Sequence, residues 1–399
     1  MTTTNQRRTL GVGVIAFGWM GRLHARGYRS LSERYPELGV RCELVSCADT
    51  VAKNRDEAVA GFGFARAVAD YRELLADPEV EVVSICAPNF LHHEIALAAV
   101  AAGKPFWIEK PMGVSAAQSA EIARAAEGAG LITATGFNYR HQPPVQQARG
   151  LIRSGQLGRI TNARVWLIAD YAASPDGAFT WRYTREQAGA GVVGDLLSHG
   201  ADLAQYLVGR IAQVTAMTDI FVPTRPVPLG VAVGHGAVEL SDERREVENE
   251  DYVAVLARTD DGVPVTLESS RVSHGPRAEY VIEVYGTQGS VRWNFEHPQH
   301  LQVLLDGDGP HGYRSVLSGM ADGDYGRFQP GPGMHLSFDD SKVIEARQFV
   351  ESVLTGRQLA PSAADAWSAA EVDEAVVASA ADGRWHPVAR VEGPTTFDA

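Results

Sequence analysis

Short apolar runs alternate with amphipathic stretches over roughly the first third of the chain. The runs are LGVGVIAF, CELVSCAD, VEVVSICAP, KPFWIEKP and LITATGFN. Runs nearly continuous in Val, Ile, Ala and Cys are typical of strands that are buried on both faces of a parallel sheet. The intervening stretches are rich in alanine or carry apolar residues at helical spacing, at 21–31, 53–59, 71–75, 92–102 and 116–129. This alternation predicts a doubly wound α/β domain.

The pattern changes after about residue 144. Helical stretches at 145–154 and 195–207 flank a predicted strand at 160–168. Strand-like runs then follow one another closely, joined by short turns such as DDG and GTQG, which is typical of an antiparallel sheet. The runs lie at 214–221, 252–258, 263–271, 280–285, 291–295 and 301–305.

Two further features complete this second, α+β part. Residues 306–339 contain eight glycines and no period, which predicts a long loop acting as a lid or an interface arm. Helical patterns at 341–354 and 363–381 predict two final helices. We therefore expect two domains, at 1–140 and 141–399.

Composition narrows the function classes. The 399 residues are 45% hydrophobic and 21% charged, as in globular proteins, and the net charge is −13. An acidic surface repels phosphate backbones and anionic lipids. No apolar run reaches the ~18 residues of a membrane-spanning helix. The sequence therefore predicts neither nucleic acid nor membrane as a partner. The three cysteines, Cys42, Cys47 and Cys86, form no disulfide framework or metal motif and are expected to be buried thiols.

One possible targeting signal lies at the N-terminus. Arg7 and Arg8 precede an apolar run at 10–20, which superficially resembles a twin-arginine export signal. The same run is also the predicted first strand and glycine turn, on which the rest of the domain depends. We therefore predict a cytoplasmic protein that keeps this segment.

The first run ends in a glycine turn, AFGWMG. It departs from the G-x-G-x-x-G fingerprint at its first position, where Ala16 suffices if its φ stays negative. Gly18 lets the backbone approach a pyrophosphate at a helix N-terminus, and Gly21 permits close packing of helix on strand. A glycine turn without a ligand explains the motif equally well when it is taken alone. The predicted cofactor contacts in this turn are Phe17, Gly18, Trp19, Met20 and Gly21.

The second run ends in Asp49, 28 residues after Gly21. This spacing exceeds the usual ~20, and the polar stretch at 32–40 can absorb the difference. A carboxylate here accepts hydrogen bonds from ribose hydroxyls and repels a ribose phosphate, which favours NAD over NADP. Two interpretations stay open, because Asp49 can also cap the next helix.

The third and fourth runs place polar residues where strands end, the edge at which such sheets bind ligands. Pro88, Asn89 and His92 follow the third run, with helix capping and an ordinary satisfied histidine as the alternatives. The fourth run ends in Glu109 and Lys110 before a proline, which keeps Lys110 extended. A surface ion pair is the alternative interpretation of these two.

Four segments together resemble a known family: GVIAFGWMGRLHA, APNFLHHEIALAAVAAGKPFWIEKP, GFNYRHQPPV and GAGVVGDLLSHGADLAQYL. In this order they resemble the Gfo/Idh/MocA family, the glucose–fructose oxidoreductase and inositol dehydrogenase relatives. The resemblance covers residues 10–208 and, more loosely, the remaining sheet and helices. It implies an NAD(P)-binding Rossmann domain over 1–140. It also implies a substrate domain over 141–399, with a large open, mainly antiparallel sheet that forms homodimers or homotetramers.

The resemblance assigns roles residue by residue. It makes Lys110 the active-site lysine, places Glu109 near the nicotinamide ribose, and matches Asp195 and His199 to an Asp-x-x-x-His pair. Residues four apart share a helical face, so both side chains can point into one cleft, although an ordinary surface Asp–His contact has the same spacing. Further predicted cofactor residues are Asn138, Trp181 and Arg182. Tyr139 and Arg140 are predicted either to line the substrate pocket or to pack in the core.

These residue types fit hydride transfer from a hydroxyl-bearing carbon. The hydroxyl must lose its proton, and His199 has the ordinary pKa that suits a base at neutral pH. Lys110 can donate a hydrogen bond to the developing alkoxide, and Asp195 can orient His199 or bind a neighbouring hydroxyl. Lys110 as the base is the alternative, since burial and positive neighbours lower a lysine pKa.

The sequence thus predicts an NAD-dependent oxidoreductase, with NADP the less favoured cofactor and no metal. Its predicted partner is a small polyhydroxylated molecule: a sugar, a glycoside or a cyclitol. One alternative is a glycosidase that oxidises its substrate transiently and holds NAD without exchange. Another is a dinucleotide-binding sensor without turnover, against which the intact Lys110, Asp195 and His199 argue.

Overall fold

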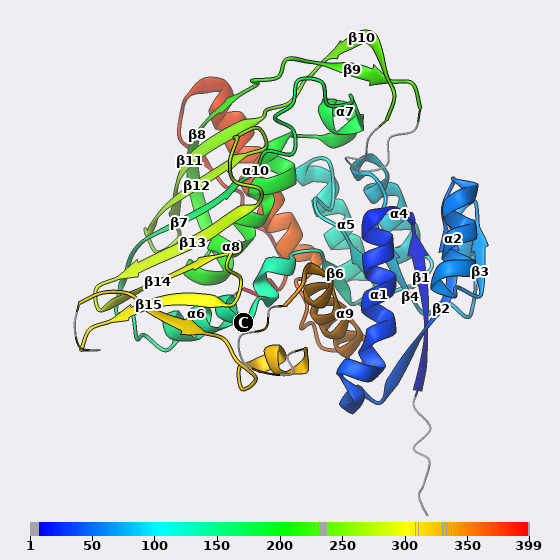
Figure 1. The fold of residues 1–399 in the computed structure, drawn as a ribbon, viewed down its shortest axis with the longest axis horizontal. Helices are drawn as coiled ribbons and strands as arrows, with labels where there is room; N and C mark the ends of the chain where they lie inside the picture. The colour runs from blue at the N-terminus through cyan, green and yellow to red at the C-terminus, as the bar shows by residue number, and fades with distance from the viewer. Residues whose placement is uncertain are drawn as a thin grey trace, which may run out of the picture.

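The computed structural model describes residues 8–230, 238–307, 309, 311–328, 331, 334 and 336–397. Within these residues the chain forms a six-stranded sheet, a nine-stranded sheet and a separate two-stranded hairpin (Figure 1). Arg8 begins the first strand, whereas Arg7 lies outside the described residues. None of the helices in this part of the chain is long and apolar enough to cross a bilayer.

The N-terminal sheet is parallel, with strand order β3-β2-β1-β4-β5-β6. Its strands are β1 (Arg8–Ile15), β2 (Val40–Ala48), β3 (Arg66–Val68), β4 (Val82–Ile85), β5 (Phe106–Ile108) and β6 (Thr133–Thr135). Its helices are α1 (Trp19–Arg34), α2 (Ala52–Phe62), α3 (Tyr71–Ala76), α4 (Asn89–Ala101) and α5 (Ala116–Gly128). This is the predicted Rossmann order, and its reversal between β1 and β4 opens a crevice at the strands' carboxyl ends.

The C-terminal sheet is mixed and mainly antiparallel, in the order β16-β15-β14-β13-β7-β12-β11-β8-β17. Only β12 and β7 pair in parallel among these described strands. The strands are β7 (Ile160–Ile168), β8 (Ile211–Asp219), β11 (Tyr252–Thr259), β12 (Pro264–Ser270), β13 (Glu279–Gly286), β14 (Gly289–Asn294), β15 (His300–Leu305), β16 (Arg314–Leu317) and β17 (His386–Pro387). The expected fold class is confirmed.

Helices cover one face of this sheet. Figure 1 shows α8 (Ser198–Val208) and α10 (Ala363–Asp382) lying along it, and α6 (Pro143–Arg153) lies near β14 and β15. The other face carries large exposed apolar side chains, with Met217 62% and Leu256 55% exposed. The short remaining helices are η1 (Pro36–Leu38), η2 (Asn138–His141), η3 (Trp181–Tyr183), α7 (Arg185–Ala188), the π-helical η4 (Val193–Leu197) and η5 (Gly323–Arg327).

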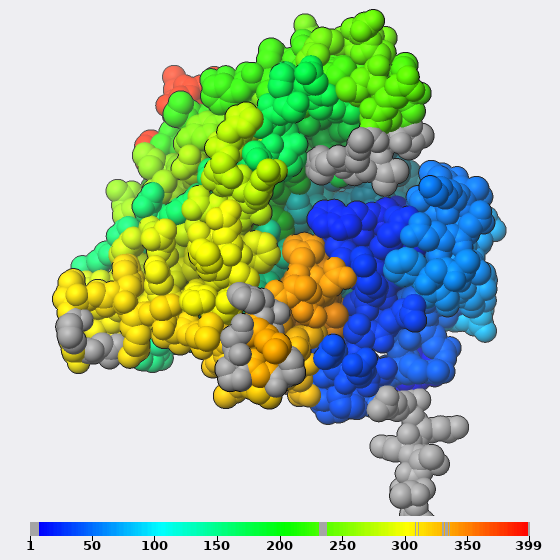
Figure 2. All heavy atoms as spheres, viewed as in Figure 1, coloured from blue at the N-terminus to red at the C-terminus, as the bar shows by residue number. Residues whose placement is uncertain are grey.

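Helix α9 (Phe338–Thr355) returns from the second half of the chain to the Rossmann domain. It packs on α1, and its Val343 and Phe349 share a core cluster with Val12 of β1. The glycine-rich segment before it is not all loop, because it carries β16 and η5. Asp324 of that segment accepts a hydrogen bond from the Tyr35 hydroxyl of the first domain at 2.9 Å. In Figure 2 the orange region, which also includes α9, lies between the yellow sheet and the blue domain. The described part of the segment therefore bridges the two halves of the molecule.

The hairpin of β9 (Thr224–Pro228) and β10 (Leu240–Glu246) was not expected from the sequence. It belongs to neither large sheet, and Figure 1 shows it above α7 at one end of the molecule. Its strands lack a regular alternation of apolar and polar residues. The sequence pattern therefore gave no signal for it.

Candidate active site

The turn after β1 contains a strained residue. Ala16 has φ +67°, in the left-handed region, so the expectation of a negative φ is wrong. The turn brings the Ala16 carbonyl against α1, where a Cβ at Gly21 would lie 2.3 Å from its oxygen. Gly21 thus permits the close packing that the motif requires. Alanine at position 16 costs about 1 kcal/mol relative to an unstrained conformation.

The N-terminus of α1 faces open space. Gly18 is its N-cap, no side chain caps the helix, and a Cβ at Gly18 would meet nothing within 4 Å. The first amides of a helix lack internal partners and favour an anion. The exposed Trp19 ring stacks on Phe338 of α9 at 5.8 Å. This turn therefore fits the pyrophosphate of a dinucleotide.

Asp49 stands just before α2 but does not cap it, because the N-cap is Val51 and no side chain caps that helix. Its carboxylate accepts hydrogen bonds from the backbone N–H of Phe17 at 2.7 Å and of Val51 at 2.8 Å. It also accepts from the side chain of Asn54 at 3.1 Å. Asp49 thus ties the glycine turn to the start of α2, while standing at the strand end where a ribose would lie.

His92 is an internal bridge. It is 1% exposed, and its two ring nitrogens lie 2.8 Å from the Pro111 carbonyl and 2.7 Å from the Ala87 carbonyl. Burial lowers its pKa. Asn89, which follows the α4 N-cap Pro88, donates to the Ala188 carbonyl at 3.3 Å. His92 therefore joins the segments that follow β4 and β5, and Asn89 joins the start of α4 to α7.

Glu109 points into the protein. Its Oε1 accepts hydrogen bonds from Lys342 at 2.8 Å and His24 at 2.9 Å, and the residue is 7% exposed. Burial opposes its charge, but the Lys342 ammonium and His24 hold the pKa of the carboxyl below its usual range. Lys342 also lies 2.7 Å from Glu345. This cluster therefore ties α1 and α9 to the end of β5.

Lys110 points the other way, toward the second domain. Its Nζ donates to Oδ1 of Asp195 at 2.9 Å and to the Asp195 carbonyl at 2.7 Å. Tyr171, just beyond β7, donates its hydroxyl to Oδ2 of Asp195 at 2.6 Å. Although burial opposes it, Lys110 and Tyr171 hold the pKa of Asp195 well below its usual range. Asp195 is therefore ionised, and two donors fix it.

His199 lies on α8 beside this cluster, but among the described residues it forms no hydrogen bond or ion pair with Asp195. It is 6% exposed, with Tyr139 and Phe137 edge-on to its ring at 4.9 and 5.9 Å. Among the described residues no side chain or carbonyl hydrogen-bonds its nitrogens. Burial, with the Lys110 charge next, lowers its pKa well below the ordinary value. A neutral imidazole follows, able to accept a proton.

The π-helical turn explains why the four-residue spacing did not pair Asp195 with His199. Asp195 lies inside η4, whereas His199 follows in α8. A π turn has more residues per turn than an α-helix, so the i,i+4 rule does not apply across it. The carboxylate is thereby directed to Lys110.

The other predicted residues divide between cleft and core. Arg140 is 2% exposed and ion-paired with Asp202 and Asp365, which places it in the core. Tyr139 stacks on Tyr280 at 4.2 Å and also borders His199. Asn138 is buried at 3% exposure.

Trp181 and Arg182 lie on the short helix η3 near this cluster. The Arg182 guanidinium lies 4.3 Å from the Trp181 ring, and that ring is edge-on to Phe90 of α4 at 6.1 Å. The charge of Arg182 contributes to the lowered pKa of Asp195. This turn therefore packs against α4, and the charge of Arg182 favours the ionised form of Asp195.

Sequence reasoning missed Tyr171, His24 and Lys342. Tyr171 follows a predicted strand by three residues, so the strand-end argument used for Lys110 could have found it. Lys342 lies 233 residues from Glu109, and nothing local in the sequence signals that contact.

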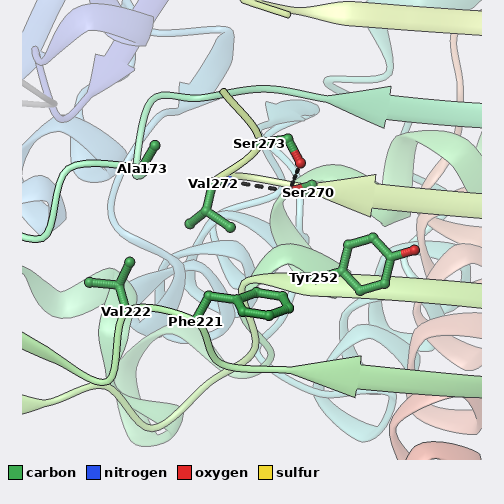
Figure 3. A pocket seen from close by; sticks show the side chains of 7 residues that line it. All are labelled: Ala173, Phe221, Val222, Tyr252, Ser270, Val272 and Ser273. Carbon is green, nitrogen blue, oxygen red and sulfur yellow. Dashed lines mark hydrogen bonds between the residues drawn. The ribbon is translucent and has the colours of Figure 1, made fainter. Parts of the chain in front are cut away.

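A hollow of about 460 Å³ lies elsewhere, at the ends of β8, β11 and β12 (Figure 3). It is lined by Ala173, Phe221, Val222, Tyr252, Ser270, Val272 and Ser273. None of these was predicted as a site residue, and its polar groups include Ser273, whose hydroxyl donates to Ser270 at 2.7 Å. Within the described residues no cluster of His, Cys, Asp and Glu is suited to a metal ion.

Comparison with known proteins identifies the family. Residues 10–137 match the oxidoreductase family with an NAD-binding Rossmann fold, and 145–292 match the GFO/IDH/MocA C-terminal domain. Levoglucosan dehydrogenase of Pseudarthrobacter phenanthrenivorans is 33% identical over 391 residues, 96% of this chain and 99% of that protein. The chain belongs to the GFO/IDH/MocA family of oxidoreductases, and the resemblance found in the sequence is confirmed.

Other relatives agree. Inositol 2-dehydrogenase of Streptomyces avermitilis is 30% identical over 377 residues, 92% of this chain and 91% of that protein. A solved levoglucosan dehydrogenase with NADH and levoglucosan has a TM-score of 0.89 and 31% identity, covering 96% of this chain and 100% of that chain. The same enzyme with NADH and L-sorbose has a TM-score of 0.91, at the same identity and coverage.

Proposed function

We propose that this protein is an NAD-dependent dehydrogenase that oxidises a secondary hydroxyl of a sugar, with levoglucosan or a related anhydrosugar as the first candidate. The observation that carries the proposal is the partly exposed Lys110–Asp195–Tyr171 cluster beside an unpaired, neutral His199. The full-length similarity to levoglucosan dehydrogenase supports the choice of substrate. Cyclitols are the second candidate, because an inositol dehydrogenase is also similar over most of the chain.

The side chains divide the chemistry as follows. The bound nicotinamide supplies the hydride acceptor. His199 takes the hydroxyl proton, because its ring is neutral and no group among the described residues hydrogen-bonds its nitrogens. Lys110 donates to the substrate oxygen as negative charge develops on it. Asp195 holds Lys110 in place, and the hydroxyl of Tyr171 keeps the Asp195 carboxylate oriented.

The cofactor site is proposed on the residues of the glycine turn. The uncapped N-terminus of α1 would hold the pyrophosphate, and Asp49 would accept from the ribose hydroxyls. A ribose phosphate at that position would meet the Asp49 charge. We therefore propose that the protein uses NAD rather than NADP. Separately, the low cysteine count leads us to propose a cytoplasmic location.

One screen tests substrate and cofactor together. The purified protein is incubated with levoglucosan, L-sorbose, glucose and inositols, each with NAD and with NADP, while the absorbance of reduced nicotinamide is followed. Turnover of an anhydrosugar with NAD at the highest kcat/KM is expected, and Asp49→Ser should narrow the gap between NAD and NADP. A wild-type preference for NADP, or turnover of none of these compounds, contradicts the proposal.

We also propose a homodimer or homotetramer formed through the uncovered face of the nine-stranded sheet. Exposed Met217 and Leu256 lie on neighbouring strands β8 and β11 of that face. Contiguous exposed apolar side chains mark association surfaces. Light scattering after size exclusion should give an oligomer, and Leu256→Asp with Met217→Asp should give a monomer. A monomeric wild type contradicts this.

A further inference from the structure

Arg225, on strand β9 of the hairpin, is an unusual buried arginine. It is 1% exposed, and within the described residues it has no carboxylate partner at ion-pair distance. A buried guanidinium requires hydrogen-bond acceptors to offset its lost hydration. The position of the guanidinium therefore depends on the groups that accept its hydrogen bonds.

The acceptors are carbonyl oxygens of a single loop. Arg225 donates to the Ser174 carbonyl through Nη1 at 2.9 Å and to the Ala172 carbonyl through Nη2. A Cβ at Gly177 would lie 2.9 Å from Nη1, so the loop wraps closely around the guanidinium. The guanidinium also lies over the Tyr183 ring, 4.3 Å from the ring centroid. Arg225 thus fixes the loop that follows β7.

This loop presents Tyr171 to the site. Tyr171 directly precedes the first carbonyl that Arg225 holds, and its hydroxyl is 2.6 Å from Asp195. Asp195 in turn accepts from Lys110. A contact chain therefore runs from the hairpin through the loop and Tyr171 to the Lys110–Asp195 pair.

We propose that Arg225 is a positioning residue for the reaction: it fixes the loop 170–174 so that Tyr171 stays hydrogen-bonded to Asp195. The proposal rests on the proposed dehydrogenase function. The hairpin then contributes to the active-site architecture through Arg225 and the loop that it holds. Small displacements of a positioned group reduce turnover strongly while leaving the protein folded.

A double-mutant cycle tests this link. Arg225→Met and Tyr171→Phe are each expected to lower kcat by about 10–100-fold, with the KM for NAD changed less than about threefold. The double variant should be no slower than Tyr171→Phe by more than about twofold, because the first change acts through the second. Arg225→Lys keeps the charge and one donor direction, and should recover part of the rate.

Arg245 provides the matched control. It lies opposite Arg225 in the hairpin pairing, but its side chain is 61% exposed. Arg245→Met should leave the kinetics unchanged. Multiplicative losses in the double variant, or an unchanged kcat in Arg225→Met, overturn the proposal. If Arg225→Met does not fold, the same cycle with Arg225→Lys decides.

A second measurement is independent of turnover. Hydrogen exchange of peptides covering 170–177, in the substrate-free protein, should be faster in Arg225→Met than in the wild type and Arg245→Met. Absence of turnover with every sugar would contradict the proposed function but leave this measurement intact. Unchanged exchange of these peptides would overturn the role of Arg225 itself.

Discussion

Glu109 and Lys110 are neighbours at the end of β5, and each forms an ion pair with a residue far away in the sequence. The Glu109–Lys342 pair is closed, with side-chain exposures of 9% and 1%. The Lys110–Asp195 pair is open, with side-chain exposures of 16% and 36%. Successive residues of an extended chain point to opposite sides. Two successive residues thus supply one buried ion pair and one partly exposed ion pair.

Each lysine uses two of its three donors within the protein, and the two differ in exposure: 1% for the side chain of Lys342 and 16% for that of Lys110. Lys342 divides its protons between two buried carboxylates, Glu109 and Glu345. Lys110 uses two of its three donors on one residue, Asp195, and no third acceptor lies on it among the described residues. The remaining donor of Lys110 is therefore the more accessible one, whereas the closed pair joins α9 to the Rossmann sheet.

Removing Lys110 tests the open pair and has the largest expected effect. Lys110→Ala should lower kcat by roughly 10²–10⁴, the range for loss of a positioned donor or base. Stability and NADH binding should change little, because Tyr171 still bonds Asp195 and the side chain is partly exposed. Steady-state kinetics, thermal unfolding and a cofactor titration measure the three quantities. Turnover within about threefold of the wild type would remove Lys110 from the site.

Removing Lys342 tests the closed pair. Lys342→Met leaves the Glu109 carboxylate buried with a hydrogen bond from His24 but without its cation, so the free energy of unfolding should fall by about 3–5 kcal/mol. Urea unfolding measures this, and the exposed Lys53→Met serves as the control with a change below about 0.5 kcal/mol. Adding Glu109→Gln to Lys342→Met should restore part of the stability. A loss below 1 kcal/mol would show that the Lys342 ion pairs do not stabilise the packing of α9 on the Rossmann sheet.

The sequence predicted the fold well where local pattern decides it. The β1 run is buried along Leu10 to Ile15, and the last helix, expected at 363–381, spans Ala363–Asp382 because Ser362 caps its start and Gly383 ends it. Strand ends located Lys110, and the family motif located Asp195. Local signals of this kind act within one or two turns of chain.

Contacts between distant segments were not predictable in this way. The spacing of Asp195 and His199 suggested a shared face, but the π turn between them depends on packing with the rest of the domain. Ala16 adopts a positive φ that its residue type disfavours, because the turn requires it. Arg225 has no local motif at all, and its role depends on the fold of the hairpin onto the β7 loop.

The pH dependence of stability sharpens the comparison, with the smallest expected effect. Burial lowers the pKa of His24 to about 4, although its bond to Glu109 opposes this, whereas the unfolded value is about 6.5. Below pH 6.5 the unfolded state therefore binds a proton that the folded state does not. The free energy of unfolding falls as pH drops from about 6.5 toward 4, by about 1–2 kcal/mol at pH 5 from this residue. Other buried neutral histidines add in the same direction.

The variant His24→Gln isolates that contribution. Glutamine keeps a donor for Glu109 but does not titrate, so the difference in stability between pH 7 and pH 5 should shrink relative to the wild type. Urea unfolding at the two pH values measures it. The pH profile of kcat/KM should be unchanged, because His199, and not His24, faces the Lys110 side of the strand end. An equal loss of stability in both proteins, or a shifted activity profile in the variant, would show that the closed and open sides are coupled.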